Sequence, residues 1–453
     1  MNGETPLKPL PGRRGFLIGL RETIAYLLNP DGFIATRTRE FGPVFGTILF
    51  FRPTAVVGGP PAVGDFLAHE RTITESSLPG PFTTLHTPYG ALNQSGSRHR
   101  ATRIGYQPLF QNDALENYLP VLTQSITAFT DRICRQGHTN IARDSKIFCL
   151  NLFSELLTGA PLSDDEVEAF ITYNAALLSL SRLLPAFQRG LDALALLQQR
   201  MAQRLQRVRQ GNLRSTCLPL LLSNRDEQDR LWSDERVATA TILLIWGAYI
   251  EVASLMASTL IQSEGRGDVR ERILQEAAAA GLADRSVVGT LADWTLPYTQ
   301  GVVREALRLS PPAGGGFRLA SADVAIGGYR IPAGTVITAD PRIGNRMPSL
   351  YPEPDSFQPE RWLKDKGSRS RCPLAGSAAA LPKGAWFPGG IGTHACPGIP
   401  LAELCGRIFL VRWMQAIESW RQPEGTAAAI PYTWVPIKIP TDAYRLMVQA
   451  AEH

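Results

Sequence analysis

The chain has 453 residues, of which 44% are hydrophobic, enough to form a large buried core. Its formal net charge is +5 at pH 7, without a basic stripe interleaved with aromatic residues, which argues against nucleic-acid binding. The six cysteines are widely spaced and form no CxxC pair, so a disulfide framework and a zinc site are not indicated and a reducing cytosol is favoured.

The chain shows no linker run, internal repeat or low-complexity segment, which predicts one large, mainly helical domain over residues 1–453. Residues 1–15 are polar and proline-rich and lack the apolar core of a signal peptide. No run approaches the roughly 20 apolar residues that a membrane span needs. We therefore expect a soluble protein without a membrane anchor, located in the cytoplasm.

Short elements are predicted for the N-terminal part of the chain. Residues 16–28 have the spacing of a short helix, and residues 41–60 form a β-rich segment whose two strands turn at Arg52-Pro53. Residues 69–96 are rich in Pro, Gly, Ser and Thr with little periodicity, as functional lids often are. Helical spacing then recurs in three segments: 112–136, 165–184 and 187–209.

The next predicted helix covers residues 236–262 and begins with N-cap chemistry at Ser233. Its middle is almost wholly apolar, as in a helix that is buried all round. Glu251 lies four residues after Gly247 and therefore on the same face. A carboxylate in such a helix is costly unless it is paired or neutral. Two interpretations of Glu251 stay open: a proton donor or substrate anchor, or a structural partner of a buried arginine.

Two further helices are predicted over residues 268–280 and 295–309. The second carries Glu305 and Arg308, which stand three residues apart and can form an ion pair. Residues 313–340 are β-rich, with strand-like stretches that alternate with glycine-containing turns.

A glycine-rich loop with a single cysteine occupies residues 386–398, with the sequence WFPGGIGTHACPG. An apolar helical run, residues 399–413, follows at once. A helix N-terminus favours the thiolate form of a cysteine through the helix dipole and the free backbone N–H groups. Cys396 by itself could be an inert structural cysteine, but its setting also suits the thiolate ligand of a haem iron.

Three stretches follow one another along the chain: EALR at 305–308, PERW at 359–362, and the cysteine loop. In this order they resemble the ExxR, PERW and cysteine-loop signatures of the cytochrome P-450 superfamily, and the resemblance extends from about residue 10 to the end. It implies a mainly α fold with small β-sheets (α+β), in which haem lies between a long distal helix and the helix of the cysteine loop. It also implies that Glu305, Arg308 and Arg361 form a buried, architectural hydrogen-bonded network.

The resemblance further implies haem b as the cofactor, with Cys396 as the axial ligand of the iron. Four side chains match positions that bind the haem propionates in the family: His99, Arg103, Arg318 and His394. His99 and Arg103 stand four residues apart on a predicted helix and share one face. Charge-assisted hydrogen bonds from Arg and His suit propionates. Outside this context, such a pair is more often part of a solvated face.

The expected distal catalytic residues are Gly247, Ile250 and Glu251, and two positions here depart from the family pattern. Tyr249 stands at the usual acid position and Ile250 at the usual threonine position. Isoleucine has no hydroxyl that could deliver a proton. In the cysteine loop, Gly389 replaces the usual phenylalanine, which could alter the hydrogen bonding around the sulfur.

The resemblance implies oxidation of a lipophilic small molecule with O2, in secondary metabolism. Because no flavin or iron–sulfur motif is present, the electrons would come from a separate ferredoxin or flavodoxin system. Hydroxylation and oxidative coupling of phenols or indoles both stay open. The altered distal helix also fits rearrangement of a substrate peroxide, which needs no redox partner. The non-enzyme alternative is a haem-based gas sensor, in which the long pocket-forming elements would be superfluous.

Overall fold

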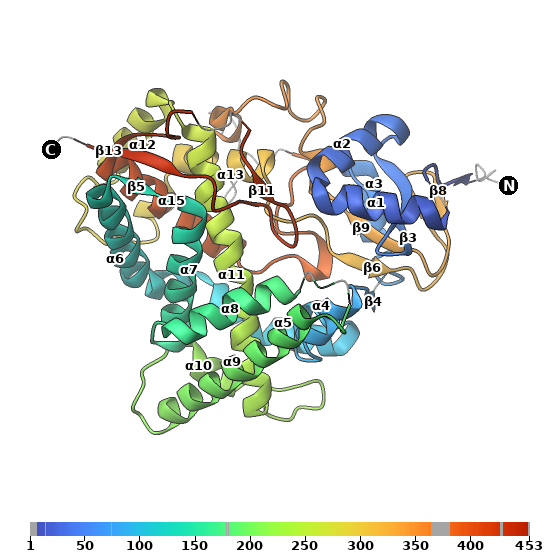
Figure 1. Cartoon of the computed structure of the whole chain (residues 1–453), viewed down its shortest axis with the longest axis horizontal. Coiled ribbons are helices and arrows are strands. Elements are labelled where there is room, and N and C mark those ends of the chain that lie inside the picture. The colour runs from blue at the N-terminus through green and yellow to red at the C-terminus, as the bar shows by residue number, and fades with distance from the viewer. Residues whose placement is uncertain are drawn as a thin grey trace. The chain divides into compact units, whose positions relative to one another are not determined.

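The computed structural model describes residues 7–451 except residues 14, 74, 178, 180, 364–380 and 426–428 (Figure 1). Cys372 therefore lies outside the described residues. The chain is mainly helical with small β-sheets, which confirms the predicted fold class. It forms two compact units: unit 1 comprises Met1–Arg100, Ala313–Ser356 and Ala378–Cys396, and unit 2 comprises Ala101–Pro312, Phe357–Ser377 and Pro397–His453. The expectation of one large domain stays a prediction.

Unit 1 contains two small sheets, with strand orders β2-β3-β9-β6-β4 and β1-β8-β7. The strands are β1 (Lys8–Pro9), β2 (Val44–Leu49), β3 (Arg52–Val57), β4 (Glu75–Ser76), β6 (Phe317–Leu319), β7 (Val324–Ile326), β8 (Tyr329–Ile331) and β9 (Val336–Ala339). The helices are α1 (Phe16–Leu28), α2 (Pro30–Phe41), α3 (Pro60–Ala68), α4 (Gly80–Leu85) and α14 (Pro341–Gly344), with short 3-10 turns η1 (Ala91–Asn93) and η6 (Gly392–His394).

The turn between β2 and β3 lies at Phe50-Phe51, not at Arg52-Pro53 as predicted. Both phenylalanines have left-handed backbone angles, with φ of 52° and 61°. Pro53 is tolerated within β3 because the parallel pairing of β3 with β9 begins only at Thr54. The missing N–H of the proline therefore interrupts no hydrogen bond on that side of the strand.

The core of unit 1 fixes the start of the cysteine loop. Val57 on β3, Val63 on α3 and Ile337 on β9 are fully buried in one apolar cluster. Phe387 belongs to the same cluster, with 5% of its surface exposed. Because this ring is held in the core, the chain enters the glycine-rich loop from a fixed position.

Unit 2 is mainly helical and also contains a few short strands. Its helices are α6 (Asn112–Gln136), α7 (Ile141–Thr158), α8 (Asp164–Ala176), α9 (Pro185–Arg209), α10 (Cys217–Leu222), α11 (Asp234–Ser263), α12 (Gly267–Ala279), α13 (Pro297–Leu309) and α15 (Ile399–Ala416), with 3-10 turns η2 (Gln107–Phe110), η3 (Asp293–Thr295) and η4 (Pro359–Trp362). The strands are β5 (His138–Thr139), β10 (Ile417–Arg421), β11 (Tyr432–Thr433), β12 (Ile439–Pro440) and β13 (Leu446–Ala450). Helix α5 (Gly96–Tyr106) belongs partly to each unit.

Helix α11 is the central helix of unit 2, because α7, α9, α13 and α15 all pack against it. Its Ser233 accepts a hydrogen bond from the backbone N–H of Arg236, as the N-cap prediction requires.

Among the described residues, α11 is also the one helix long and apolar enough to cross a membrane, with a mean hydropathy of 1.7. Within the protein 72% of that stretch is buried, as in the core helix of a soluble protein.

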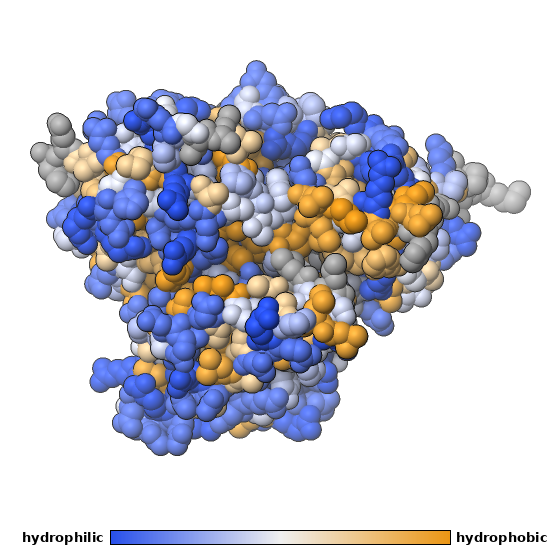
Figure 2. Space-filling view, viewed as in Figure 1, coloured by the Kyte–Doolittle hydropathy of each residue, from blue (hydrophilic) through white to orange (hydrophobic). Residues whose placement is uncertain are grey.

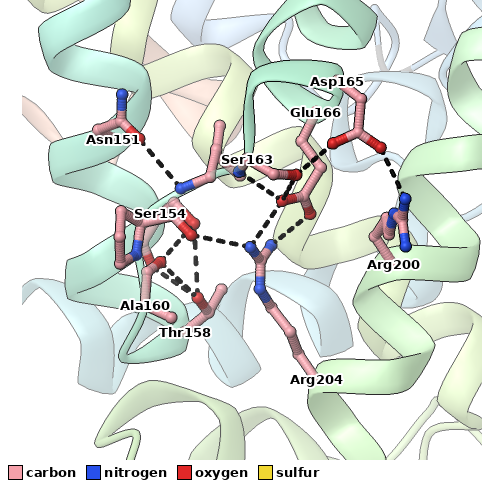
Figure 3. Close-up of polar contacts among 11 residues, drawn as sticks. Asn151, Ser154, Thr158, Ala160, Ser163, Asp165, Glu166, Arg200 and Arg204 are labelled. Carbon is pink, nitrogen blue, oxygen red and sulfur yellow. Dashed lines mark hydrogen bonds and ion pairs between the residues drawn. The ribbon is translucent and has the colours of Figure 1, made fainter.

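Helices α8 and α9 lie side by side and are joined by a polar network (Figure 3). Glu166 near the start of α8 accepts a hydrogen bond from the backbone N–H of Ser163 at 2.9 Å, and its carboxylate pairs with Arg204 of α9 at 2.7 Å.

The predicted helix over 165–184 is too long, because α8 ends at Ala176. Leu184 is extended ahead of Pro185, which begins α9, since a residue before proline avoids the helical region.

Candidate functional site

The cysteine loop has the backbone conformation that its glycines predict. Gly390 and Gly392 both have positive φ, at 78° and 77°. The backbone N–H of Cys396 donates to the carbonyl of Gly389 at 2.7 Å and closes the loop. Cys396 forms no disulfide among the described residues and is exposed, and it stands three residues before α15. The loop therefore presents a thiol where a metal can reach it.

Glu70 supports this loop and was not identified from the sequence. Its carboxylate accepts hydrogen bonds from the backbone N–H and the side-chain hydroxyl of Thr393, the latter at 2.9 Å. A Cβ at Gly392 would lie 2.2 Å from a Glu70 carboxylate oxygen, so a larger residue at this position would displace the carboxylate. Glu70 and Thr393 are 323 residues apart in the chain, which explains why local patterns did not reveal the pair.

The structure brings two of the predicted propionate donors into direct contact. His99 of α5 and His394 of η6 stack with ring centroids 3.7 Å apart and ring planes 9° apart. His99 is buried and His394 is half-buried. Arg103 lies one helical turn after His99 on α5 and is half-buried. The two imidazoles thus form one surface beside the cysteine loop.

Arg318 on β6 is a buried cation, with 6% of its surface exposed. Burial lowers the pKa of its guanidinium to about 10, and the negative charge of Glu70 partly opposes this shift. Among the described residues no carboxylate forms an ion pair with Arg318. A buried guanidinium needs an anion to compensate its charge. Arg318 is therefore suited to bind an acidic group of a ligand.

One face of α11 stays partly open, so the prediction that this helix is buried all round is wrong. Five residues at helical spacing are only half-buried: Leu243, Leu244, Gly247, Ala248 and Glu251. A Cβ at Gly247 would meet no atom within 4 Å. The other distal candidate, Ile250, is buried beside this face. Four apolar residues and one carboxyl thus form a half-open stripe on α11, the α11 stripe.

Burial raises the pKa of Glu251 to about 8, because the ionised carboxyl would lose its hydration in these surroundings. Near neutral pH the side chain is therefore mostly a neutral acid that can donate a hydrogen bond. Among the described residues, Glu251 forms no ion pair with an arginine. This observation favours the role of proton donor or substrate anchor over that of a structural partner.

The architectural network around Glu305 is confirmed within unit 2. The carboxylate of Glu305 accepts hydrogen bonds from Arg308 at 2.8 and 2.7 Å and from Arg361 at 2.9 Å. It also accepts from the indole N–H of Trp362 at 2.8 Å and from the backbone N–H of Gln358 at 3.0 Å. Glu305 and Arg308 are fully buried, so this carboxylate connects α13 to η4.

The donor set of unit 1 fits a haem held by a thiolate. The accessible sulfur of Cys396 can ligate the iron. The cationic Arg318 and the stacked His99 and His394 match the two acidic side chains that a haem carries. These four residues all belong to unit 1, although three separate stretches of chain supply them.

The comparisons with known proteins all find members of one protein family. A family model described as Cytochrome P450 matches residues 9–446. Cytochrome P450 120 of Synechocystis sp. is 27% identical over 415 residues, which cover 90% of each chain. Cytochrome P450 26B1 of Danio rerio is 26% identical over 456 residues, which cover 97% of this chain and 86% of the relative.

A solved structure described as retinoic acid bound cyanobacterial CYP120A1 is similar to this chain with a TM-score of 0.85. The two are 26% identical, and the match covers 98% of this chain and 100% of that one.

Proposed function

The chain belongs to the cytochrome P450 family, and from this premise we propose that it uses haem b to oxidise a lipophilic small molecule with O2. Membership makes it a haem-thiolate enzyme of the monooxygenase type, a class that works with redox partners and lipophilic substrates. We further propose a separate ferredoxin- or flavodoxin-type electron donor, a cytoplasmic location, and a role in secondary metabolism.

One observation carries the proposal: the exposed thiol of Cys396 lies in the same unit as Arg318, a buried cation without a carboxylate partner among the described residues. Cys396 would hold the iron, while Arg318, His99, Arg103 and His394 would hold the propionates. Bound haem would supply the activation of O2. The protein supplies the orientation of the substrate and the delivery of protons.

Glu251 takes the place of the missing threonine hydroxyl in this proposal. Its carboxyl is mostly protonated near neutral pH, because burial raises its pKa to about 8. It can therefore release a proton and recover it from solvent in each turnover, which Ile250 cannot do. The apolar residues of the α11 stripe would hold the hydrocarbon part of the substrate.

We propose an elongated lipophilic carboxylic acid as the substrate class. The support is the similarity to a protein whose solved structure is described as retinoic acid bound. A panel of retinoic acid, the corresponding alcohol and a short fatty acid tests this class by the shift that each causes in the haem absorption. Retinoic acid should bind most tightly. Equal binding of all three would contradict the class.

The type of reaction is tested with isotopically labelled O2. With NADPH, a ferredoxin system and a bound substrate, one labelled oxygen atom should enter each product molecule. Unlabelled coupled product would instead favour oxidative coupling. Product formed from a hydroperoxide without an electron donor would favour rearrangement, the second candidate, which the absence of a hydroxyl at Ile250 supports. Either result would contradict the proposed oxygen insertion.

We expect Glu251→Gln to stabilise the protein near pH 8 while it lowers turnover. The pKa of Glu251 is raised when folded, so wild-type stability is greatest below the unfolded pKa of 4.5 and falls as the pH rises towards 8. Glutamine avoids this loss, and the variant should gain on the order of a few kcal/mol between pH 5 and 8. Turnover should fall about 100-fold, since the loss of acid–base catalysis typically costs that much or more.

Unfolding and turnover of the holoprotein, measured at several pH values, check this prediction. Glu168→Gln is the matched control, because Glu168 is exposed on α8 and its replacement should change neither quantity. A Glu251→Gln variant that is less stable at every pH would indicate a structural ion pair instead. Unchanged turnover with intact haem content would contradict the role of proton donor.

A further inference from the structure

Glu70 is the side chain that connects the end of α3 with the cysteine loop. It lies two residues after α3, and its backbone N–H donates to the carbonyl of Leu67 at 3.2 Å. Helix α3 is itself anchored in the core of unit 1, where Val63 and Phe66 are buried. Phe387, at the start of the cysteine loop, belongs to the same apolar cluster. The carboxylate of Glu70 therefore extends towards the loop from a firmly packed part of the backbone.

The contacts of Glu70 with the loop are concentrated at its last turn, η6. One carboxylate oxygen of Glu70 accepts from both the backbone N–H and the hydroxyl of Thr393. The preceding residue, Gly392, leaves room for this carboxylate against the loop backbone. The carbonyl of Gly392 accepts from the backbone N–H of Ala395 at 3.0 Å, directly before Cys396. Glu70 thus holds the short turn that leads into the proposed iron ligand.

The residues that would hold the propionates are also within the influence of Glu70. His394 follows Thr393 in the chain and stacks on His99, with ring centroids 3.7 Å apart. A shift of the turn would therefore move a propionate donor together with the cysteine. The charge of Glu70 also acts on Arg318, because it raises the pKa of that guanidinium against the effect of burial. All of these side chains belong to unit 1.

A carboxylate at this position has two effects that can be separated. As a hydrogen-bond acceptor it satisfies two donors of η6 and restricts the conformations of the loop. As a negative charge it opposes the addition of an electron to a nearby iron, and because Glu70 is half-buried, solvent screens this repulsion only in part. The first effect needs only an oxygen acceptor. The second needs the charge.

We propose that Glu70 is a positioning residue of the haem-thiolate centre, which holds the cysteine loop in its ligating conformation and lowers the reduction potential of the iron through its charge. Side chains that support a metal ligand are known to tune both the affinity for the metal and its potential. This inference rests on the proposed function, because it takes Cys396 as the ligand of a haem iron. A merely structural role of Glu70 would hold the loop without altering the potential.

Three variants of the holoprotein separate the acceptor from the charge, with potentiometric titration and haem transfer to apomyoglobin as the measurements. Glu70→Gln keeps an oxygen acceptor, so its potential should become more positive while haem is released no more than about fivefold faster. Glu70→Ala loses both effects and should also release haem about 10–100-fold faster. Thr393→Val loses one donor but leaves the charge, so it should release haem faster than the wild type at an unchanged potential. If Glu70→Ala cannot be isolated with haem, the other two variants still test both effects.

Figure 2 shows hydrophilic side chains over much of the visible surface, so the loss of any one surface charge has to be distinguished from the loss of Glu70. Glu75→Gln is the matched control, because Glu75 is exposed on β4 in the same unit. This control should keep the wild-type potential and the wild-type rate of haem release.

An unchanged potential in Glu70→Gln, or an equal shift in Glu75→Gln, would overturn the proposal. So would wild-type haem release by Glu70→Ala. The failure of this inference can be told from that of the proposed function by the carbon-monoxide spectrum of the reduced wild type. Without the shifted band both would fail, whereas a normal band together with unaltered Glu70 variants would overturn this inference alone.

Discussion

Replacing Glu305 by glutamine should destabilise the protein by about 3–5 kcal/mol, the cost of leaving buried charges without their partner. The carboxylate of Glu305 accepts from both Arg308 and Arg361 and from the indole of Trp362. Glutamine has the same shape but carries no charge, and its amide N–H groups would face some of these donors. Both arginines would then remain in the core without a counter-charge.

Glu360→Gln is the matched control for this experiment. Glu360 belongs to the same PERW stretch and pairs with Arg272 at 2.8 Å, but the two side chains are 50% and 44% exposed. An exposed pair of this kind contributes at most about 1 kcal/mol. Denaturant unfolding of the two variant holoproteins measures their free energies of unfolding. If Glu305→Gln fails to fold, the yields of folded haem protein are compared instead. Equal stability of the two variants would contradict the buried network.

Cys396→Ser should abolish oxidation by O2 and the shifted carbon-monoxide band of the reduced protein. A hydroxyl donates far less electron density to iron than a thiolate does, and thiolate donation favours cleavage of the O–O bond. We expect turnover to fall by more than about 100-fold. Losing a side chain that only supports a metal ligand typically costs about 10–100-fold, and Cys396 would be the ligand itself.

Cys405→Ser is the control, since Cys405 is buried in α15 and burial raises the pKa of its thiol to about 12. Its replacement should leave the band and the turnover near the wild-type values. If Cys396→Ser kept the shifted band, or if Cys405→Ser lost it, the assignment of the ligand would be wrong.

Much of the fold followed from local patterns. Residues 16–28 and 112–136 correspond to α1 and α6 to the residue, because their apolar spacing begins and ends at clear breaks. Helix α7 was missed, although Asn140 caps it by accepting from the backbone N–H of Arg143 at 3.1 Å and Gly159 ends it. These two capping residues were the available signal.

Some residues of the site could be predicted from the order of the motifs, and others could not. The sequence located Cys396 and Glu305 because their motifs are contiguous. The support of the loop by Glu70 and the stacking of His99 on His394 depend on segments that are far apart in the chain. Such contacts leave no local periodicity.

The partly open face of α11 was not predictable for a different reason. Nearly every residue in the middle of that helix is apolar, so composition could not distinguish a buried face from one that stays open. Only the packing of the neighbouring helices reveals the α11 stripe.

The central claim is that the sulfur of Cys396 binds the haem iron. X-ray absorption at the iron edge of the purified wild-type protein tests it most directly, because the spectrum distinguishes sulfur from nitrogen and oxygen among the iron's neighbours. We predict one sulfur atom in the first shell of the wild type and none in Cys396→Ser. A first shell of nitrogen and oxygen alone in the wild type would contradict the claim.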